Sequence, residues 1–425
     1  MASQKTELTD LAINGGPKVR EKPFPGRGLL GSEEKAAVDA LFDQAIASGE
    51  AFGYNGLPEE AYCREFAEFM GGGGFADAVN SGTTAVYVAL RALNVEPFTE
   101  IIVSSITDPG GMMPVVMLNC IPVVADTEPG KYNTGPKQIE KLSSPLTGAI
   151  LVSHIGGEPA DIEAIIALAR KHRIPVVEDC AQSHGAKLNG KMVGTFGDIA
   201  AFSTMFGKHH CTGGQGGVVY TKDERLYWEV RRSADRGKPF GLPEGATNCL
   251  ASLNFNLNDL SAVIGRVQLK KLPGIIKKRQ RLVANLSEGF KKLKAVSIPP
   301  KLPGSEPSYW FLRVQLDTDK VTCDKDTFCQ ALISEGMPVA ASYRHMPHTQ
   351  DWYKNRRVFG SSGYPWKSPL YKGDPNRKFP CPNALAVTAV QFNLAVYESW
   401  GEPEAVDIIT VFKKVESAYL KKRGR

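Results

Sequence analysis

Lys208 is the residue whose surroundings could make its side chain a nucleophile. It follows the apolar run 202–207 and precedes a glycine cluster at 213–217. Apolar and small neighbours lower the pKa of a lysine, because burial disfavours the ammonium form, and the neutral amine can attack a carbonyl. The same pattern is also typical of a surface lysine beside a glycine-rich turn. Evidence from other segments is therefore needed to decide whether Lys208 is a nucleophile or a surface residue.

Three further segments could contact the same ligand as Lys208. Residues 81–83 stand between a short strand and a helix start, which suits either a phosphate site or an ordinary helix cap. Asp179 ends an apolar strand, where a buried acid needs a cation, a donor or a structural partner. Ser203 ends another strand, five residues before Lys208. A reactive lysine, an acid for a ring nitrogen and small donors for a phosphate are together what pyridoxal 5'-phosphate requires.

The elements that must position these residues alternate between strands and helices. Short, wholly apolar strands separated by amphipathic helices predict a largely parallel α/β sheet that is buried on both faces. Ligands of such sheets bind at the carboxyl ends of the strands. Helices are expected between the strands, for example at 85–93 and 161–172. The expected strands are 78–79, 101–105, 121–125, 148–153, 174–178, 199–203 and 217–221.

The chain divides into three parts by composition. Residues 1–30 are polar and rich in Gly and Pro and are expected to form an N-terminal arm. Residues 31–275 are expected to form the large α/β domain, and residues 276–425 a smaller α+β domain. Further expected elements are helices at 32–48, 57–70, 257–294, 325–335 and 403–421 and strands at 308–316 and 337–341.

Composition argues against several classes of protein. The net charge of the 425 residues is +6 without a long basic block, which does not favour a nucleic-acid-binding protein. Eight scattered cysteines, no apolar leader and no long apolar run predict a cytoplasmic protein without a membrane span. Adjacent side chains in an extended segment point to opposite faces, so 209–211 (His-His-Cys) would chelate one ion poorly, and no metal is expected.

Several segments together resemble the DegT/DnrJ/EryC1/StrS family of sugar aminotransferases. The resemblance covers nearly the whole chain and implies the fold of type I pyridoxal-phosphate enzymes. The segments that carry it are Asn80-Ser81-Gly82-Thr83-Thr84, the stretch 154–161 (HIGGEPAD), the stretch 178–186 (EDCAQSHGA), Phe202-Ser203 with Lys208, and the stretch 259–265 (DLSAVIG).

The resemblance also implies roles for individual residues. Lys208 would form a Schiff base with pyridoxal 5'-phosphate and carry a proton, and Asp179 would pair with the pyridine nitrogen. Gln182 would lie near the phenolic oxygen of the ring. The phosphate would be bound by Gly82, Thr83, Ser203 and, from a partner subunit, Asn254. The resemblance therefore implies a homodimer with shared active sites.

Some residues depart from the family pattern. Asp108 stands where the family has an aromatic residue that stacks on the ring, and it could instead contact the substrate. The glycine cluster holds Gln215 instead of an acid and is one residue longer, and Asn256 fills a position that is often Arg. His209 is a candidate to line the active site. His345 falls where the small domain of the family approaches it, although ordinary surface packing is an equal explanation.

The sequence therefore predicts an aminotransferase that converts a keto sugar or a ketocyclitol to the amino compound, with glutamate or glutamine as donor. Two alternatives remain. One is a sugar dehydratase that uses the pyridoxamine form, although relatives with that chemistry replace the lysine with histidine. The other is a non-catalytic regulatory relative, which the departures at Asp108 and Gln215 would suit.

Overall fold

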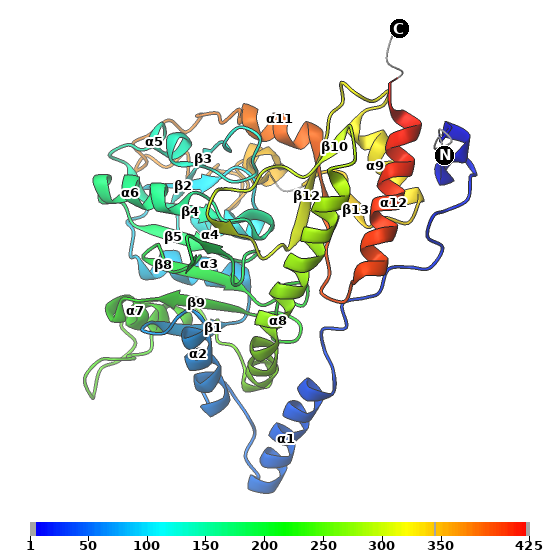
Figure 1. Cartoon of the computed structure of the whole chain (residues 1–425). Coiled ribbons are helices and arrows are strands. Elements are labelled where there is room, and N and C mark those ends of the chain that lie inside the picture. Colours follow the sequence, from blue (N-terminus) through cyan, green and yellow to red (C-terminus); the bar gives the residue numbers. More distant parts are fainter. Residues whose placement is uncertain (1–5, 344–345, 422–425) are drawn as a thin grey trace.

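A seven-stranded sheet lies at the centre of the larger part of the molecule (Figure 1). The structure is a computed structural model and describes residues 6–343 and 346–421. In spatial order the strands are β1 (Phe75–Val79), β9 (Gly217–Thr221), β8 (Ile199–Ser203), β5 (Val176–Asp179), β4 (Thr147–Ser153), β2 (Glu100–Ser104) and β3 (Ile121–Ala125). Strands β8, β5, β4, β2 and β3 run parallel, whereas β9 is antiparallel to both of its neighbours. The expected mostly parallel α/β fold is confirmed.

Helices cover both faces of this sheet, because alternate residues of each strand point to opposite sides. In β8, Ile199 and Ala201 pack into one hydrophobic core, and Ala200 and Phe202 into another. The first face is covered by α3 (Gly82–Ala92), α4 (Met113–Met117) and α7 (Glu224–Ala234). The opposite face is covered by α2 (Leu57–Phe69), α6 (Ile162–His172) and the first half of α8 (Asp259–Phe290).

A smaller antiparallel sheet carries the C-terminal part of the chain (Figure 1). Its order is β10 (Val296–Ser297), β12 (Phe311–Leu316), β14 (Gln391–Ala395) and β13 (Val339–Ala340). Helices α9 (Lys325–Ser334) and α12 (Glu402–Tyr419) and the second half of α8 complete its core. The remaining elements are the strands β6 (Lys187–Leu188), β7 (Lys191–Met192) and β11 (Ser305–Glu306), the helices α1 (Ser32–Ser48), α5 (Pro136–Glu140), α10 (Asp351–Lys354) and α11 (Pro382–Val390), and the 3₁₀ turns η1 (Leu8–Asp10), η2 (Ala12–Asn14), η3 (Pro109–Gly111), η4 (Ile155–Gly157) and η5 (Pro347–Thr349).

Helix α8 runs without interruption across the expected domain boundary at 275/276. Its first half packs on α2, and its second half contributes Leu282 and Leu286 to the C-terminal core. The division into domains at this position stays a prediction. The N-terminal arm is not wholly a surface segment, because Leu11 is fully buried in the same C-terminal core.

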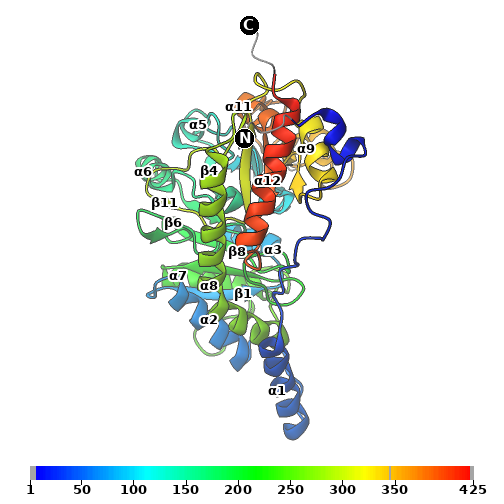
Figure 2. The same cartoon turned by 45° about the vertical axis from the view of Figure 1, so that its right-hand side comes forward.

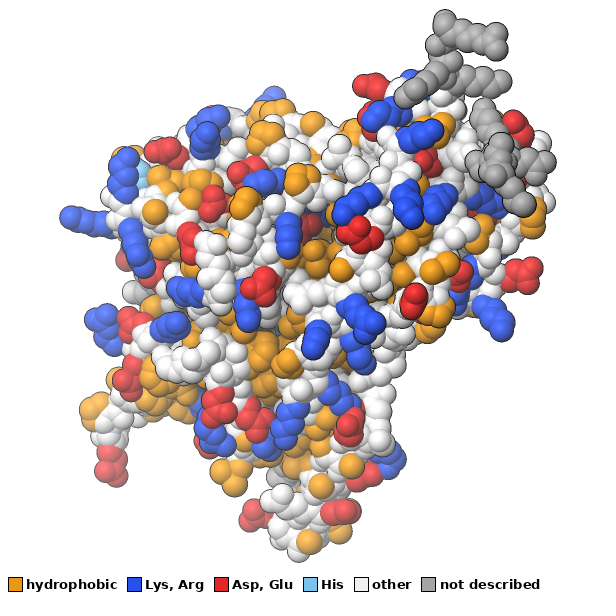
Figure 3. All heavy atoms as spheres, viewed as in Figure 1, with side chains coloured by type: hydrophobic (Ala, Val, Ile, Leu, Met, Phe, Trp, Pro, Cys, Tyr) orange, Lys and Arg blue, Asp and Glu red, His pale blue; other side chains and the backbone are white. Residues whose placement is uncertain are grey.

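Surface charge, cysteine pairing and helix length can be compared with the expectations from composition. Basic and acidic side chains are interspersed on the face that Figure 3 shows. All eight cysteines lie in the described part of the chain, and none is paired in a disulfide. Within residues 6–343 and 346–421, no helix combines the length and the apolar character that crossing a membrane demands.

Candidate active site

The loop between β8 and β9 places Lys208 in a nearly dry environment. Lys208 is only 6% exposed, and its Nζ lies 4.0 Å from the centroid of the Trp310 ring. Burial lowers the pKa of Lys208 to about 8, although the carboxylates of Asp179 and Asp108 oppose this shift. A substantial share of the amine is therefore neutral just above neutral pH, as a nucleophile requires.

Asp179 lies at the carboxyl end of β5, and a short chain of hydroxyl groups holds its carboxylate. Ser153 Oγ donates to Oδ2 over 3.0 Å, and the Ala181 N–H donates to Oδ1 over 3.0 Å. Thr107 Oγ1 lies 3.0 Å from Ser153 Oγ in turn. Burial raises the pKa of Asp179, which the two donors and Lys208 only partly offset. A cationic group close to this carboxylate would remove the remaining cost of its burial.

A buried contact between a carboxylate and a histidine fixes the end of β5 one residue earlier. Glu178 is completely buried and accepts hydrogen bonds from the N–H groups of Gly194, Phe196 and Gly197. His154 Nε2 lies 3.1 Å from the same carboxylate. Burial would raise the pKa of Glu178, but His154 and these N–H groups outweigh it, so the pKa lies below its usual value. The side chain of Glu178 thus serves structure and leaves Asp179 as the carboxylate that faces Lys208.

The start of α3 meets the end of β8 at very close range. A Cβ on Gly82 would lie 2.4 Å from Ser203 Cβ and 2.8 Å from Ser203 Oγ, so only glycine fits there. Ser81 caps α3 by accepting from the Thr84 N–H. The N–H groups of Gly82 and Thr83 precede the first hydrogen bond of the helix, and with the helix dipole and the Ser203 hydroxyl they offer a set of donors that suits an anion. The structure thus brings three of the expected phosphate contacts together.

Gln182 links two segments that are distant in the sequence. Its Oε1 accepts from the Gly156 N–H over 2.8 Å, and its Nε2 donates to the Tyr343 hydroxyl over 2.7 Å. Both side chains are buried. Gln182, three residues after Asp179, therefore connects the large part of the molecule to Tyr343 in the segment that follows β13.

The other expected site residues lie in different surroundings. Asp108 is exposed, caps η3 by accepting from Gly110, and its charge acts on both Lys208 and Asp179. His209 is fully buried and its Nε2 lies 3.1 Å from Ser308 O, while burial lowers its pKa well below the usual value. Asn254 is exposed and accepts from Asn256. His345 lies outside the described residues.

Three residues that contact Lys208 or Asp179 were not predicted. Ser153 ends β4 beside β5, so its position at the carboxyl edge of the sheet was a usable signal. Trp310 covers Lys208, and Arg27 donates to the Lys208 carbonyl. Neither of these two residues stands in a segment whose pattern points to the site.

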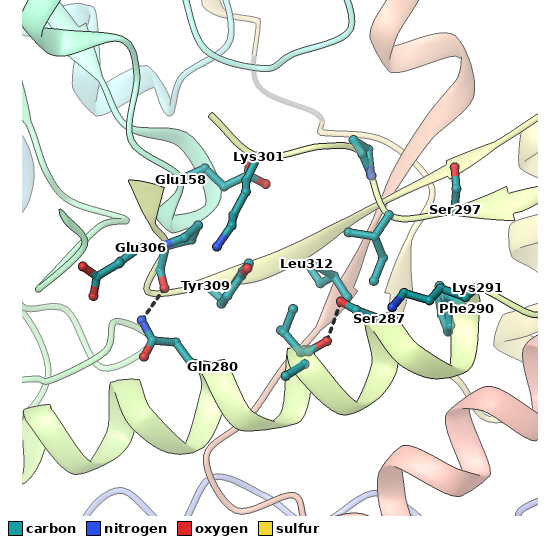
Figure 4. A pocket seen from close by; sticks show the side chains of 15 residues that line it. Glu158, Gln280, Ser287, Phe290, Lys291, Ser297, Lys301, Glu306, Tyr309 and Leu312 are labelled. Atoms are coloured by element: carbon teal, nitrogen blue, oxygen red, sulfur yellow. Dashed lines mark hydrogen bonds between the residues drawn. The ribbon is translucent and has the colours of Figure 1, made fainter. Parts of the chain in front are cut away.

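A cavity of about 580 Å³ between α8 and β12 is separate from these groups (Figure 4). Glu158, Lys301 and Tyr309 line it, and none of the expected site residues is among its described lining residues. Tyr309 and Trp310 are neighbours in the chain, yet Trp310 contacts Lys208 while Tyr309 lines the cavity.

Comparison with known proteins agrees with this geometry. The sequence profile of the DegT/DnrJ/EryC1/StrS aminotransferase family matches residues 32–408. The chain belongs to this family. The aminotransferase is 31% identical over 362 residues to an L-glutamine:2-deoxy-scyllo-inosose aminotransferase of Micromonospora echinospora, a match that covers 81% of this chain and 84% of the relative. It is 28% identical over 401 residues to the spore coat polysaccharide biosynthesis protein SpsC of Bacillus subtilis, covering 91% and 95% of the two chains.

Solved structures confirm the type I fold of this aminotransferase. An aminotransferase from Psychrobacter cryohalolentis superposes with a TM-score of 0.81 at 25% identity, covering 92% of this chain and 98% of the other. DesV of S. venezuelae superposes with a TM-score of 0.75 at 26% identity, covering 91% and 95%. The expected family and fold are thus confirmed.

The lowered pKa of Lys208 predicts an unusual pH dependence of its reactivity. Acetylation by trace acetic anhydride, followed by mass spectrometry in the cofactor-free protein, should show a midpoint near pH 8 for Lys208. The substitution Asp108→Asn should move this midpoint to lower pH, because it removes a carboxylate that favours the ammonium form. Exposed Lys301 serves as the internal reference. A midpoint for Lys208 that matches the reference would contradict the burial of the amine.

The close approach at Gly82 predicts a loss of stability on adding one methyl group. Gly82→Ala should lower the free energy of unfolding in urea by about 1–3 kcal/mol, because the new Cβ overlaps Ser203. Gly274→Ala is the matched control: this glycine is also helical but has open space around its Cβ, so stability should rise by about 0.5–1 kcal/mol. Equal effects of the two substitutions would refute the close approach.

Proposed function

We propose that this aminotransferase uses pyridoxal 5'-phosphate to transfer an amino group from glutamate or glutamine to a keto sugar or a ketocyclitol. The observation that carries the proposal is the buried, partly neutral amine of Lys208 beside the carboxylate of Asp179. The inosose aminotransferase that shares 31% identity supports both the polyol acceptor and the amide-bearing donor.

The residues present fit this cofactor. The corner of Gly82, Thr83 and Ser203 offers N–H and hydroxyl donors for a phosphate, at a position where a Cβ would leave no space. Asp179 would hold a protonated ring nitrogen, whose charge would offset the remaining cost of burying this carboxylate. Lys208 would hold the aldehyde carbon.

The chain's own groups account for the steps around the cofactor. Pyridoxal 5'-phosphate, when bound, supplies an aldehyde and a ring that accepts electrons. Lys208 can take a proton from a carbon acid and return it, because a pKa of about 8 leaves both protonation states accessible near neutral pH. Trp310 covers Nζ and keeps water from it, and Ser153 keeps Asp179 in position.

Amino transfer is favoured over the two alternatives. A dehydratase of this kind would have histidine at the position of Lys208. A regulatory relative would have no need for a buried amine, a buried carboxylate and an anion-binding corner within one site. Asp108 would then contact a hydroxyl group of the polyol, since its carboxylate is exposed beside Lys208 and Asp179.

Lys208→Ala tests the proposed function. The purified wild-type protein should show the visible absorbance band of lysine-linked pyridoxal phosphate, and the variant should lose this band and the amino transfer from glutamine or glutamate. Keto sugars and inososes would be screened as acceptors.

Asp179→Asn should retain the band but slow the transfer by about 10²-fold or more, since the ring nitrogen loses its carboxylate. A colourless wild-type protein that binds no cofactor would overturn the proposal.

We propose further that two copies form a dimer with shared active sites. Helix α1 extends away from the body of the molecule (Figures 1 and 2). Large apolar side chains are exposed on this helix and near it, namely Phe42 (45%), Ile46 (78%) and Leu57 (79%). Exposed Asn254 lies next to Leu253, which is 65% exposed, so a partner that covers this segment would also cover Asn254. The family resemblance assigns Asn254 to the phosphate site of that partner.

The dimer is tested by placing a charge on these apolar side chains. Ile46→Glu and Leu57→Glu should shift the mass measured by light scattering from two copies toward one, because a charge is costly in a buried interface. Val406→Glu is the matched control, since Val406 is also exposed (54%) but lies on α12. A wild-type protein with the mass of one chain would contradict the dimer.

A further inference from the structure

We infer that Arg27 is a positioning residue for Lys208, because it connects the loop that carries the amine to Glu398, three residues beyond β14. The inference rests on the proposed role of Lys208. Arg27 belongs to the N-terminal arm, far from the loop in sequence, and its side chain is only 12% exposed. Within the described chain it contacts both the loop and Glu398.

The guanidinium group of Arg27 contacts two successive carbonyl groups of the loop. Nη1 donates to Lys208 O over 2.6 Å, and Nη2 donates to His209 O over 3.2 Å. Nε and Nη2 also lie 2.9 Å from the same oxygen of Glu398. A planar fork of donors can make these contacts together, whereas the single ammonium group of a lysine cannot reproduce the geometry.

Glu398 also binds Arg279, which holds the backbone next to Trp310. Its second oxygen accepts from Arg279 over 2.8 and 2.9 Å, and Arg279 Nη1 donates to Tyr309 O over 2.8 Å. Burial would raise the pKa of Glu398, but Arg279 and Arg27 outweigh it, so the pKa lies below its usual value. The carboxylate is thus held charged between two arginines. Glu398 therefore binds both Arg27 of the arm and Arg279 of α8, and Arg279 holds Tyr309 two residues before β12.

A third carbonyl of the loop, that of Gly207, is bound by Trp310. Trp310 Nε1 donates to Gly207 O over 3.0 Å, while the ring of the same residue covers Lys208 Nζ. The carbonyl groups of 207, 208 and 209 therefore all accept from side chains outside the loop. Residues 204–216 contain no helix or strand, and the N–H of Lys208 donates to Met205 O within the loop. The three side-chain contacts add to such backbone hydrogen bonds and fix the carbonyl side of the backbone around Lys208.

The arm itself is anchored close to Arg27. Trp400 Nε1 donates to Pro25 O over 2.9 Å, and the rings of Phe24 and Trp400 are 4.7 Å apart. Arg20 pairs with Asp407 of α12 over 2.5 Å. Arg27 therefore reaches the loop from a segment that is already fixed on the C-terminal part of the molecule.

The test compares Arg27→Gln and Arg27→Lys with Arg20→Gln, an arm variant that loses an ion pair without touching the loop. Hydrogen exchange of the peptide that covers 204–212 is measured in the cofactor-free protein. Arg27→Gln should raise this exchange about tenfold, since it removes the hydrogen bonds to two successive carbonyl groups of the loop. Arg27→Lys should recover part of the effect, and Arg20→Gln should stay within about twofold of wild type.

Kinetics provide the second readout. Arg27→Gln should lower kcat by about 10- to 100-fold with a much smaller change in the KM for the amino donor, because a misplaced amine affects the reaction more than binding. Unchanged exchange of 204–212 in Arg27→Gln would overturn the inference, and so would equal effects of Arg27→Gln and Arg20→Gln. If the wild-type protein transfers no amino group, the proposed function fails, while the exchange comparison still decides the role of Arg27.

Discussion

Keeping the amine of Lys208 out of water is the constraint on which the rest of the site depends. Burial penalises the ammonium form, and the aromatic face of Trp310 and the charges of Asp179 and Asp108 offset only part of this penalty. A balance of this kind is sensitive to small displacements. The loop that carries the amine has no regular structure, so its carbonyl groups are bound by side chains from the arm and from the start of β12.

The groups around Lys208 come from the carboxyl ends of neighbouring strands, and buried polar contacts keep these ends in place. Glu178 is an example. Its carboxylate is hydrogen-bonded to three backbone N–H groups and to His154, and these contacts fix the backbone that bears Asp179. Gly82 has a comparable role at the phosphate corner, because the absence of a Cβ lets α3 approach β8. These residues act through shape and hydrogen bonding, and they explain why the recognisable segments contain more than the groups that would touch a cofactor.

Much of the fold was predictable from the sequence, since wholly apolar strands that alternate with amphipathic helices leave few other arrangements. The strands at 121–125, 199–203 and 217–221 coincide with β3, β8 and β9. The antiparallel direction of β9 was not predicted, because an apolar strand carries no mark of its direction. The burial of Leu11 was also missed, because a single apolar residue in a polar arm does not reveal what covers it.

The sequence by itself determined the types of groups available: one lysine after an apolar run, an acid and a serine at strand ends, and a glycine before a helix. Local spacing and strand periodicity were sufficient for this, since strands of a parallel sheet end at one edge. Only the tertiary structure decided which groups surround the amine. Arg27, Trp310 and Glu398 lie far apart along the chain and belong to no common motif, yet Arg27 and Trp310 contact Lys208 and Glu398 binds Arg27. Such contacts arise when separate elements pack together, and no local pattern in the sequence encodes them.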